Sequence, residues 1–282
     1  MTATKLAPAS PPAVDALLTH RYGAEVAGAY PVLDNPTIRL ALGHRSVRAF
    51  APTPLAPEVL PTLIAAAQSA STSSNLQVWS VIAVQDPEHK ARLAVGTRNE
   101  GFVRQAPLFL IWLADFSRAR QVSEDRDSTI NGGDFVESIV LASVEAGLAA
   151  QNAVLAAESL GLGAVYVGAI RSHVRALAAD LKLPPHVFPV FGTAIGYADE
   201  SVSHHVKPRL PQAAVLHHEY YDGAGQLDAV ETYNRALDAF WKKQSIEHPL
   251  WTDHILNRLK ANPADQRYDL RAILNELGFL LR

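Results

Sequence analysis

The chain has 282 residues, of which 48% are hydrophobic and 19% are charged, and its formal net charge at pH 7 is −3. This composition is typical of a globular protein with a sizeable core rather than of a disordered or fibrous chain. The slight acidity argues against a nucleic-acid partner, because proteins that bind nucleic acid gather Lys and Arg in a basic patch. The chain has no cysteine, which excludes disulfides, thiolate metal sites, iron–sulfur clusters and cysteine nucleophiles.

The N-terminal residues are rich in Ala and Pro and show no sustained period. They lack the basic region and unbroken apolar stretch of a signal peptide. We also find no window of about 18 charge-free apolar residues, which a membrane span needs. We therefore expect a cytoplasmic protein without a membrane partner, in which residues 1–35 form an extension, with a short helix at 13–21, and residues 36–282 form the functional domain.

The organised sequence begins with the end of a helix at 37–42, and a helical spacing of apolar residues predicts a further helix at 58–70. Short apolar runs rich in β-prone residues predict strands at 79–85 and 108–114. The longest helical pattern, 136–160, is apolar nearly all round and full of small residues, so we expect a buried helix at the centre of the fold and a candidate dimer contact.

The second half of the chain continues to alternate strands and helices. Strands are predicted at 164–170 and 187–196, and helices at 174–181, 227–243, 254–260 and 269–277. Interleaved elements of this kind indicate an α+β class, or a loosely α/β three-layer arrangement.

Three polar segments are candidates for binding an anionic ligand. The first, HRSVR at 44–48, holds two guanidiniums, an imidazole and a hydroxyl, a donor set that suits a phosphate. The second, STSSNLQ at 71–77, carries hydroxyls and amides between a predicted helix and strand. The third, KPR at 207–209, holds two cations apart by a proline. Taken singly, each segment is better explained as a solvated turn.

Other motifs are poor matches to their functions. The pair Gly161 and Gly163 lacks the third glycine of a dinucleotide-binding loop, because residue 166 is Tyr166, and it follows a helix instead of a strand. We interpret these glycines as a helix C-cap and turn. The eleven histidines include two adjacent pairs, but they lack cysteine or acidic neighbours at a metal-binding spacing, so we expect no metal site.

Considered in order, these segments resemble one family. The sequence is similar to the oxygen-insensitive nitroreductase and flavin reductase family, in the branch of the bacterial major nitroreductase, over roughly residues 37–282. The resemblance is carried by these runs: GHRSVRAF (43–50), STSSNLQ (71–77), VRQAPLFLIWLADFSR (103–118), AAQNAVLAAESLGLGAVYVGAIR (149–171), LKLPPHVFPVFGTAIGY (181–197), VKPRLP (206–211) and WTDHI (251–255).

This resemblance implies a three-layer α+β fold, in which helices flank a central mixed or antiparallel sheet, and a homodimer with two FMN sites at its interface. It also implies an oxidoreductase that takes hydride from NADPH or NADH and reduces nitroaromatic, quinone or similar electron-poor acceptors in two-electron ping-pong chemistry. A flavin reductase, a chromate reductase and a non-catalytic FMN-binding module remain as alternatives. No side chain has to act as a general acid or base, because the flavin carries the hydride.

The resemblance also assigns residues to parts of the flavin. Those expected along the phosphate and ribityl chain are His44, Arg45, Ser46, Lys207 and Arg209. Arg48 is expected at the pyrimidine side of the ring. Those expected to reach the flavin from the partner subunit are Ser73, Ser74 and Leu76. Those whose backbone is expected along the edge that carries N5 are Tyr166, Val167, Gly168 and Ala169.

The sequence departs from the family at two functional positions. Relatives often have Gly-Asn-Gln where this chain has Arg98, Asn99 and Glu100, and an ionised glutamate cannot donate as glutamine does, which predicts a changed flavin contact or pocket at Glu100. The loop 242–250, which is arginine-rich in relatives that prefer NADPH, has lysines and no arginine. The choice between NADH and NADPH therefore stays open.

Overall fold

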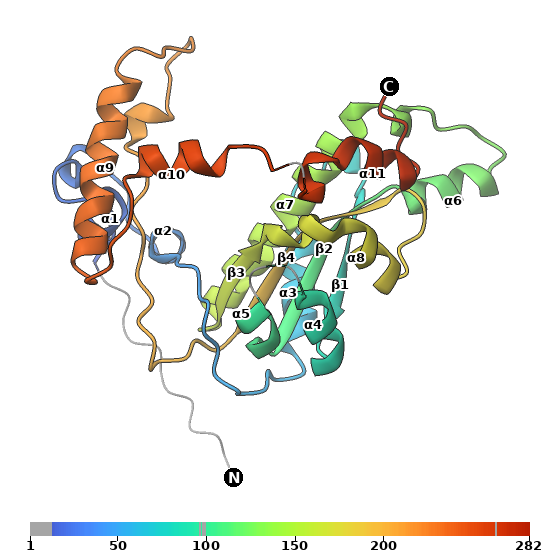
Figure 1. Cartoon of the computed structure of the whole chain (residues 1–282), viewed down its shortest axis with the longest axis horizontal. Coiled ribbons are helices and arrows are strands. Elements are labelled where there is room, and N and C mark those ends of the chain that lie inside the picture. Colours follow the sequence, from blue (N-terminus) through green and yellow to red (C-terminus); the bar gives the residue numbers. More distant parts are fainter. Residues whose placement is uncertain (1–12, 96, 98–99, 263) are drawn as a thin grey trace. The chain divides into compact units, whose positions relative to one another are not determined.

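The computed structural model describes residues 13–95, 97, 100–262 and 264–282. The chain forms two compact units (Figure 1). The first contains the described residues up to Arg45 together with His204–Ala261, and the second contains Ser46–Ser203 and Asn262–Arg282. Each unit is therefore assembled from segments that are far apart in the sequence.

The second unit is built around a four-stranded sheet in the order β1-β2-β4-β3. The strands are β1 (Trp79–Val84), β2 (Leu108–Asp115), β3 (Gly163–Val167) and β4 (Val187–Gly196). All three pairings are antiparallel, and β2 pairs with β4 from Leu108 opposite Ile195 to Asp115 opposite Val187. The chain therefore has the α+β class expected from the alternation of its elements.

The sheet is the middle of three layers, and the alternation of side chains along β2 shows why. Leu108, Leu110 and Trp112 pack with the helices α3 (Val59–Gln68) and α7 (Val136–Ser159). The intervening residues of β2 pack on the opposite face, with α4 (Pro87–Ala94), α5 (Glu100–Gln105) and α8 (Val174–Asp180). Because successive residues of a strand face opposite sides, a strand covered on both faces is apolar on both, as β2 is from Leu108 to Ala114.

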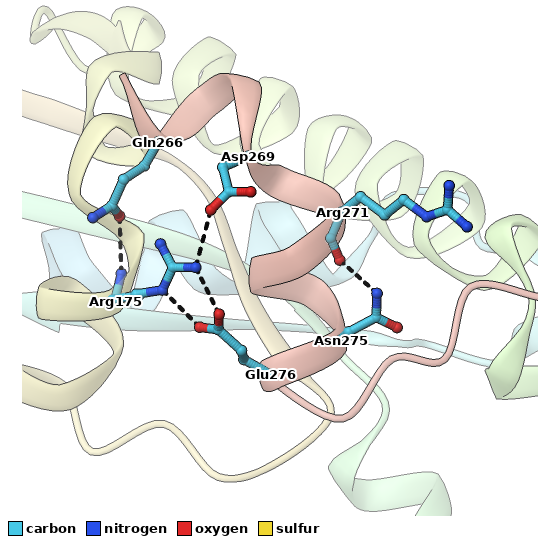
Figure 2. Close-up of polar contacts among 6 residues, drawn as sticks. All are labelled: Arg175, Gln266, Asp269, Arg271, Asn275 and Glu276. Carbon is cyan, nitrogen blue, oxygen red and sulfur yellow. Dashed lines mark hydrogen bonds and ion pairs between the residues drawn. The ribbon is translucent and has the colours of Figure 1, made fainter. Parts of the chain in front are cut away.

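The C-terminal segment completes the second unit. Its helix α11 (Leu270–Glu276) buries Ile273 and Leu274, and Phe279 lies beside them in the same cluster. Figure 2 shows how Arg175 of α8 holds this helix: its guanidinium donates to both carboxylate oxygens of Glu276, each at 2.6 Å, and to Asp269 at 3.0 Å. The second unit also contains α6 (Ser117–Asp125) and the short 3-10 segments η2 (Ser73–Asn75), η3 (Gly132–Asp134), η4 (Gly168–His173) and η6 (Gln266–Tyr268).

The first unit is helical. Its elements are α1 (Val14–Tyr22), η1 (Ala27–Ala29), α2 (Pro36–Gly43), η5 (Gln212–Ala214), α9 (Gln226–Lys242) and α10 (Trp251–Arg258). The start of α2 follows from its sequence, because Asn35 accepts from the backbone N–H of Ile38 at 2.9 Å and Pro36 occupies the first helical turn. Helix α1 confirms the short helix expected within the extension.

Most predicted elements are confirmed, with two kinds of error. The strand predicted at 164–170 ends at Val167, since Gly168 begins the 3-10 segment η4. The sequence pattern does not predict α4, α5 and α6 (Ser117–Asp125). These helices are short, and α4 and α6 carry few apolar residues, so their hydrophobic period is weak.

Helix α7, which we expected to be buried and to be a candidate dimer contact, is buried on one face within the single chain. Its alanine-rich face packs in the core, but Val136, Val140, Val144 and Leu148 are each about half exposed. Among the described helices α7 alone is long and apolar enough to cross a membrane. Its buried Glu145 bonds to two backbone amides, and its alanines pack against β2 and α3, so we assign α7 as a core helix.

Candidate functional site

The segment from Ser46 to Arg48 lies beside β3 because of a close backbone contact. Ser46 forms a parallel bridge with Ala164, and the N–H of Val47 donates to the carbonyl of Ala164 at 3.0 Å. Val47 is buried, whereas Ser46 and Arg48 are exposed. The alternation leaves the hydroxyl and the guanidinium free to meet a ligand while the valine anchors the segment.

This contact depends on Gly163, because a Cβ at that position would overlap the Val47 side chain. The sequence predicts a helix C-cap and turn at both Gly161 and Gly163. Gly161 has a φ of +78° and does form the turn after α7. Gly163 instead lies inside β3, where it makes room for Val47.

The segment Ser73–Gln77 is a strained loop. Ser74, Asn75 and Gln77 have φ values of +48°, +57° and +52°, which are uncommon for residues with a side chain. Ser73, Ser74 and Leu76 are exposed, and Leu76 is 53% exposed. Strain of this kind persists only where the surrounding structure holds it, and it is common in ligand-binding loops.

Two side chains that sequence analysis did not single out hold this loop. Glu145 of α7 is only 2% exposed, and its two carboxylate oxygens accept from the backbone N–H groups of Ser73 and Val78, both at 2.8 Å. Arg118 of α6 donates to the carbonyls of Gln77 at 2.8 Å and Trp79 at 3.1 Å. The only sequence signal for Glu145 is a charge in the middle of an apolar helix.

The end of β3 carries the next predicted segment. Val167 is fully buried, and Tyr166, Gly168 and Ala169 are partly exposed. The Tyr166 hydroxyl donates to Gln151 at 3.2 Å, and burial, helped by Glu158, raises the pKa of Tyr166 to about 12. Tyr166 is therefore a neutral hydrogen-bonding group at physiological pH.

Glu100 lies at the start of α5 and is partly exposed. Its carboxylate lies 3.3 Å from the guanidinium of Arg104, one turn along the same helix. The negative charge is thus partly balanced locally, in the way that such pairs commonly stabilise short helices. The preceding Arg98 and Asn99 lie outside the described residues.

The remaining predicted residues, His44, Arg45, Lys207 and Arg209, belong to the first unit. Nζ of Lys207 lies 4.7 Å from the centre of the Trp241 ring, within the range of a cation–π contact. Nη1 of Arg209 donates to the carbonyls of Lys207 and Pro208 at 3.2 and 3.1 Å. The main chains at His44 and Lys207 are brought together, since both carbonyls accept from Arg21.

The histidines of the described residues form no group of three potential metal ligands with one another or with Asp and Glu. His248, in the loop 242–250, stacks on Trp241 with ring centres 4.7 Å apart and an angle of 12° between the planes. His254 lies 5.6 Å beyond it. These rings therefore contact one another as an aromatic cluster in the first unit.

Comparison with known proteins identifies the family. The model of the nitroreductase family matches residues 41–95 and 95–197, and that of the nitroreductase family C-terminal domain matches residues 207–282. The chain therefore belongs to the nitroreductase family, whose fold is the α+β arrangement described above.

Individual relatives agree with this assignment over most of their length. The FMN reductase (NADPH) of Bacillus subtilis is 36% identical over 250 residues, which is 87% of this chain and 98% of the relative. The oxygen-insensitive NADPH nitroreductase of Salmonella typhimurium is 35% identical, over 80% of this chain and 91% of the relative. The structure of NfrA2 from B. megaterium superimposes with a TM-score of 0.83 at 36% identity, covering 88% of this chain and all of NfrA2.

Proposed function

We propose that the chain is an FMN-dependent oxidoreductase that uses NADPH or NADH to reduce nitroaromatic, quinone or similar electron-poor acceptors. The observation that carries this proposal is the contact of the Ser46–Arg48 segment with β3. It joins an exposed cationic and hydroxyl-bearing segment to the strand that ends at Tyr166 and Val167. These are two of the segments that the family resemblance assigns to one flavin.

The donor set fits FMN. A phosphate monoester requires cationic and hydroxyl donors, and Arg45 and Ser46 present one of each to solvent. Reduced flavin carries negative charge on its pyrimidine side, which a guanidinium such as that of Arg48 would stabilise. The strained Ser73–Gln77 loop offers further exposed hydroxyls and amides on a fixed backbone.

In this proposal the protein binds and orients the flavin, and FMN supplies a centre that accepts and gives up two electrons. His44, Arg45, Lys207 and Arg209 would hold the phosphate. The main chain at Tyr166–Ala169 would lie along the reactive edge of the ring, and Ser73, Ser74 and Leu76 would come from the partner subunit. Glu100 would present an acceptor where glutamine presents a donor, which would change the contact at that side of the pocket.

A second candidate function is a flavin reductase, in which the acceptor is free FMN. It is favoured by relatives of that description, namely the FMN reductase of B. subtilis and the NADPH-flavin oxidoreductase of Vibrio harveyi, which is 33% identical over its whole length. The two functions share cofactor and donor, so substrate kinetics separates them.

The test is anaerobic mixing of the purified protein with NADPH and, separately, with NADH while the flavin absorbance is followed. We expect a yellow protein that bleaches rapidly with at least one donor and recovers its colour with a nitroaromatic, a quinone or free FMN. A colourless protein that takes up no FMN would contradict the proposal. A flavin that bleaches only slowly with both donors would indicate a binding module without this activity.

We further propose that the chain is a cytoplasmic homodimer that pairs through α7. Val136, Val140, Val144 and Leu148 recur at every fourth residue and so form one apolar stripe, which is about half exposed. Contiguous apolar surface of this kind is typical of a subunit interface. Gly147, beside Leu148, has no side chain to keep a second helix away.

A further inference from the structure

Arg21 is an arginine with unusual surroundings. It lies at the end of α1, in the segment that sequence analysis interpreted as an extension, and it is only 6% exposed. Arginine is rarely buried to this extent unless its donors are matched by acceptors. The identity of those acceptors therefore indicates what the residue is for.

The guanidinium of Arg21 donates to the main chain of two segments that are distant in sequence. Nη2 donates to the carbonyls of Leu42 at 2.6 Å and His44 at 2.9 Å, and Nη1 donates to the carbonyl of Lys207 at 2.9 Å. His44 opens the HRSVR segment and Lys207 opens the KPR segment. Both segments are candidates for phosphate binding, and one side chain fixes the distance between them.

The backbone of Arg21 adds a fourth contact to the same place. The N–H of Arg209 donates to the carbonyl of Arg21 at 2.7 Å. The KPR segment is therefore held at both ends, since Lys207 accepts from the Arg21 side chain and Arg209 donates to its main chain. A planar guanidinium can reach several carbonyls at once, whereas a lysine ammonium cannot reproduce that fork.

The segment that carries Arg21 is itself fastened within the first unit. The Tyr30 hydroxyl accepts from the N–H of Gln212 at 3.0 Å, and Glu25 forms an ion pair of 2.7 Å with Arg235 of α9. Gly23 has a φ of +83°, and a Cβ there would lie 3.1 Å from Cβ of Ala236. These contacts fix the end of α1, and with it the position of Arg21.

Arg21 lies outside the part of the chain that the family model matches, which begins at residue 41. Relatives are covered over 98% to 100% of their length by 87% to 88% of this chain. The bridge from α1 is therefore contributed by a segment that precedes the matched region.

We propose that Arg21 is a positioning residue for the phosphate of the bound flavin. By holding the main chain at His44 and at Lys207, it sets the spacing of the cationic side chains on either side and thereby selects flavins that carry a phosphate. The extension is thus part of the binding site instead of a decoration. This inference rests on the proposed binding of FMN.

The test uses full-length protein freed of flavin and titrated with FMN and with riboflavin, which lacks the phosphate. Flavin fluorescence gives both dissociation constants. The variants are Arg21→Met, which removes the donors, and Arg21→Lys, which keeps the charge and loses the fork. The matched control is Arg235→Met, because Arg235 also ties the extension to the first unit but is exposed and contacts neither phosphate segment.

We expect Arg21→Met to weaken FMN binding by about tenfold or more, because it removes the donors that Arg21 supplies to the partly buried carbonyls of Leu42, His44 and Lys207 and so releases both segments. The dissociation constant for riboflavin should change by less than about twofold. The FMN dissociation constant of Arg21→Lys should lie between those of wild type and Arg21→Met. The Arg235→Met variant should have the wild-type dissociation constants for both ligands.

Three results would overturn the inference: an unchanged FMN constant in the Arg21 variants, an equal loss for FMN and riboflavin, or the same loss in Arg235→Met. If Arg21→Met is not soluble, the ratio of the two constants in Arg21→Lys decides alone. Failure of wild type to bind FMN would refute the proposed function itself, which is a separate result.

Discussion

At the scale of single residues, the structure shows buried polar side chains that hydrogen-bond to the backbone of the candidate ligand-binding segments. Glu145 is an example, since a carboxylate on an apolar helix would be costly unless it were matched by donors. Its partners are backbone amides at the two ends of the Ser73–Val78 segment. These hydrogen bonds offset the cost of burying the carboxylate, and they hold the loop in one conformation.

Glu145→Gln should therefore weaken FMN binding and lower stability. The variant keeps the size of the side chain but places an NH₂ group against a backbone donor, at a cost of about 1–3 kcal/mol. The measurements are FMN titration and urea unfolding of the flavin-free protein. Glu137→Gln, an exposed carboxylate of the same helix, is the control, and an equal effect in both variants would contradict a role in holding the loop.

Gly163 is the second residue whose role becomes clear only from packing. Gly163→Ala should lower the free energy of unfolding by about 1–3 kcal/mol, because the added methyl overlaps Val47 and displaces the Ser46–Arg48 segment. Gly101→Ala is the matched control. Gly101 lies in α5 with open space where its Cβ would be, so this change should stabilise by about 0.5–1 kcal/mol. Urea unfolding measures both, and a neutral Gly163→Ala would count against the contact.

At the scale of elements, α11 is joined to α8 by charges on the surface as well as by apolar packing. Hydrogen bonding to Arg175 lowers the pKa of Glu276 and raises the pKa of Arg175 itself. The ionised carboxylate is thus favoured in the folded state. Its contribution to stability is present above the ordinary glutamate range and is lost as the pH falls through the lowered pKa.

The expected consequence is a pH dependence located at α11. Wild-type stability should decrease as the pH is lowered from 7 into the carboxylate range, and Glu276→Gln should flatten that decrease. Urea unfolding at a series of pH values is the measurement. Identical slopes in the two proteins would show that the pair with Arg175 does not contribute.

Helices and strands are predicted correctly from the sequence where the pattern of apolar residues reflects which faces of the element are covered. Strand β2 was found because both of its faces are covered, which makes it apolar from Leu108 to Ala114. Helix α4 was missed although Asp86 and Pro87 mark its start, because few of its residues are apolar and the helical period is faint. The end of β3 at Val167 depends on the turn that follows, and no local preference marks it.

At the scale of the whole molecule, the exposed apolar stripe of α7 is the proposed surface of dimer contact. Val144→Glu should convert the proposed dimer to a monomer and release FMN, because a charge would face the apolar stripe of the second copy. Val122→Glu is the control, since Val122 is equally exposed but lies on α6. Light scattering gives the mass, and a Val144→Glu protein that remains dimeric would contradict pairing through α7.

The sequence by itself determined the family, the order of the elements and the polar segments from which a flavin site would be built, because periodicity, turn residues and motifs are local properties of the chain. The tertiary structure decided which residues support those segments. Arg21, Glu145 and Gly163 act through partners that are distant in sequence, namely Lys207, Ser73 and Val47. No local pattern records such contacts, since they exist only once the backbone has folded.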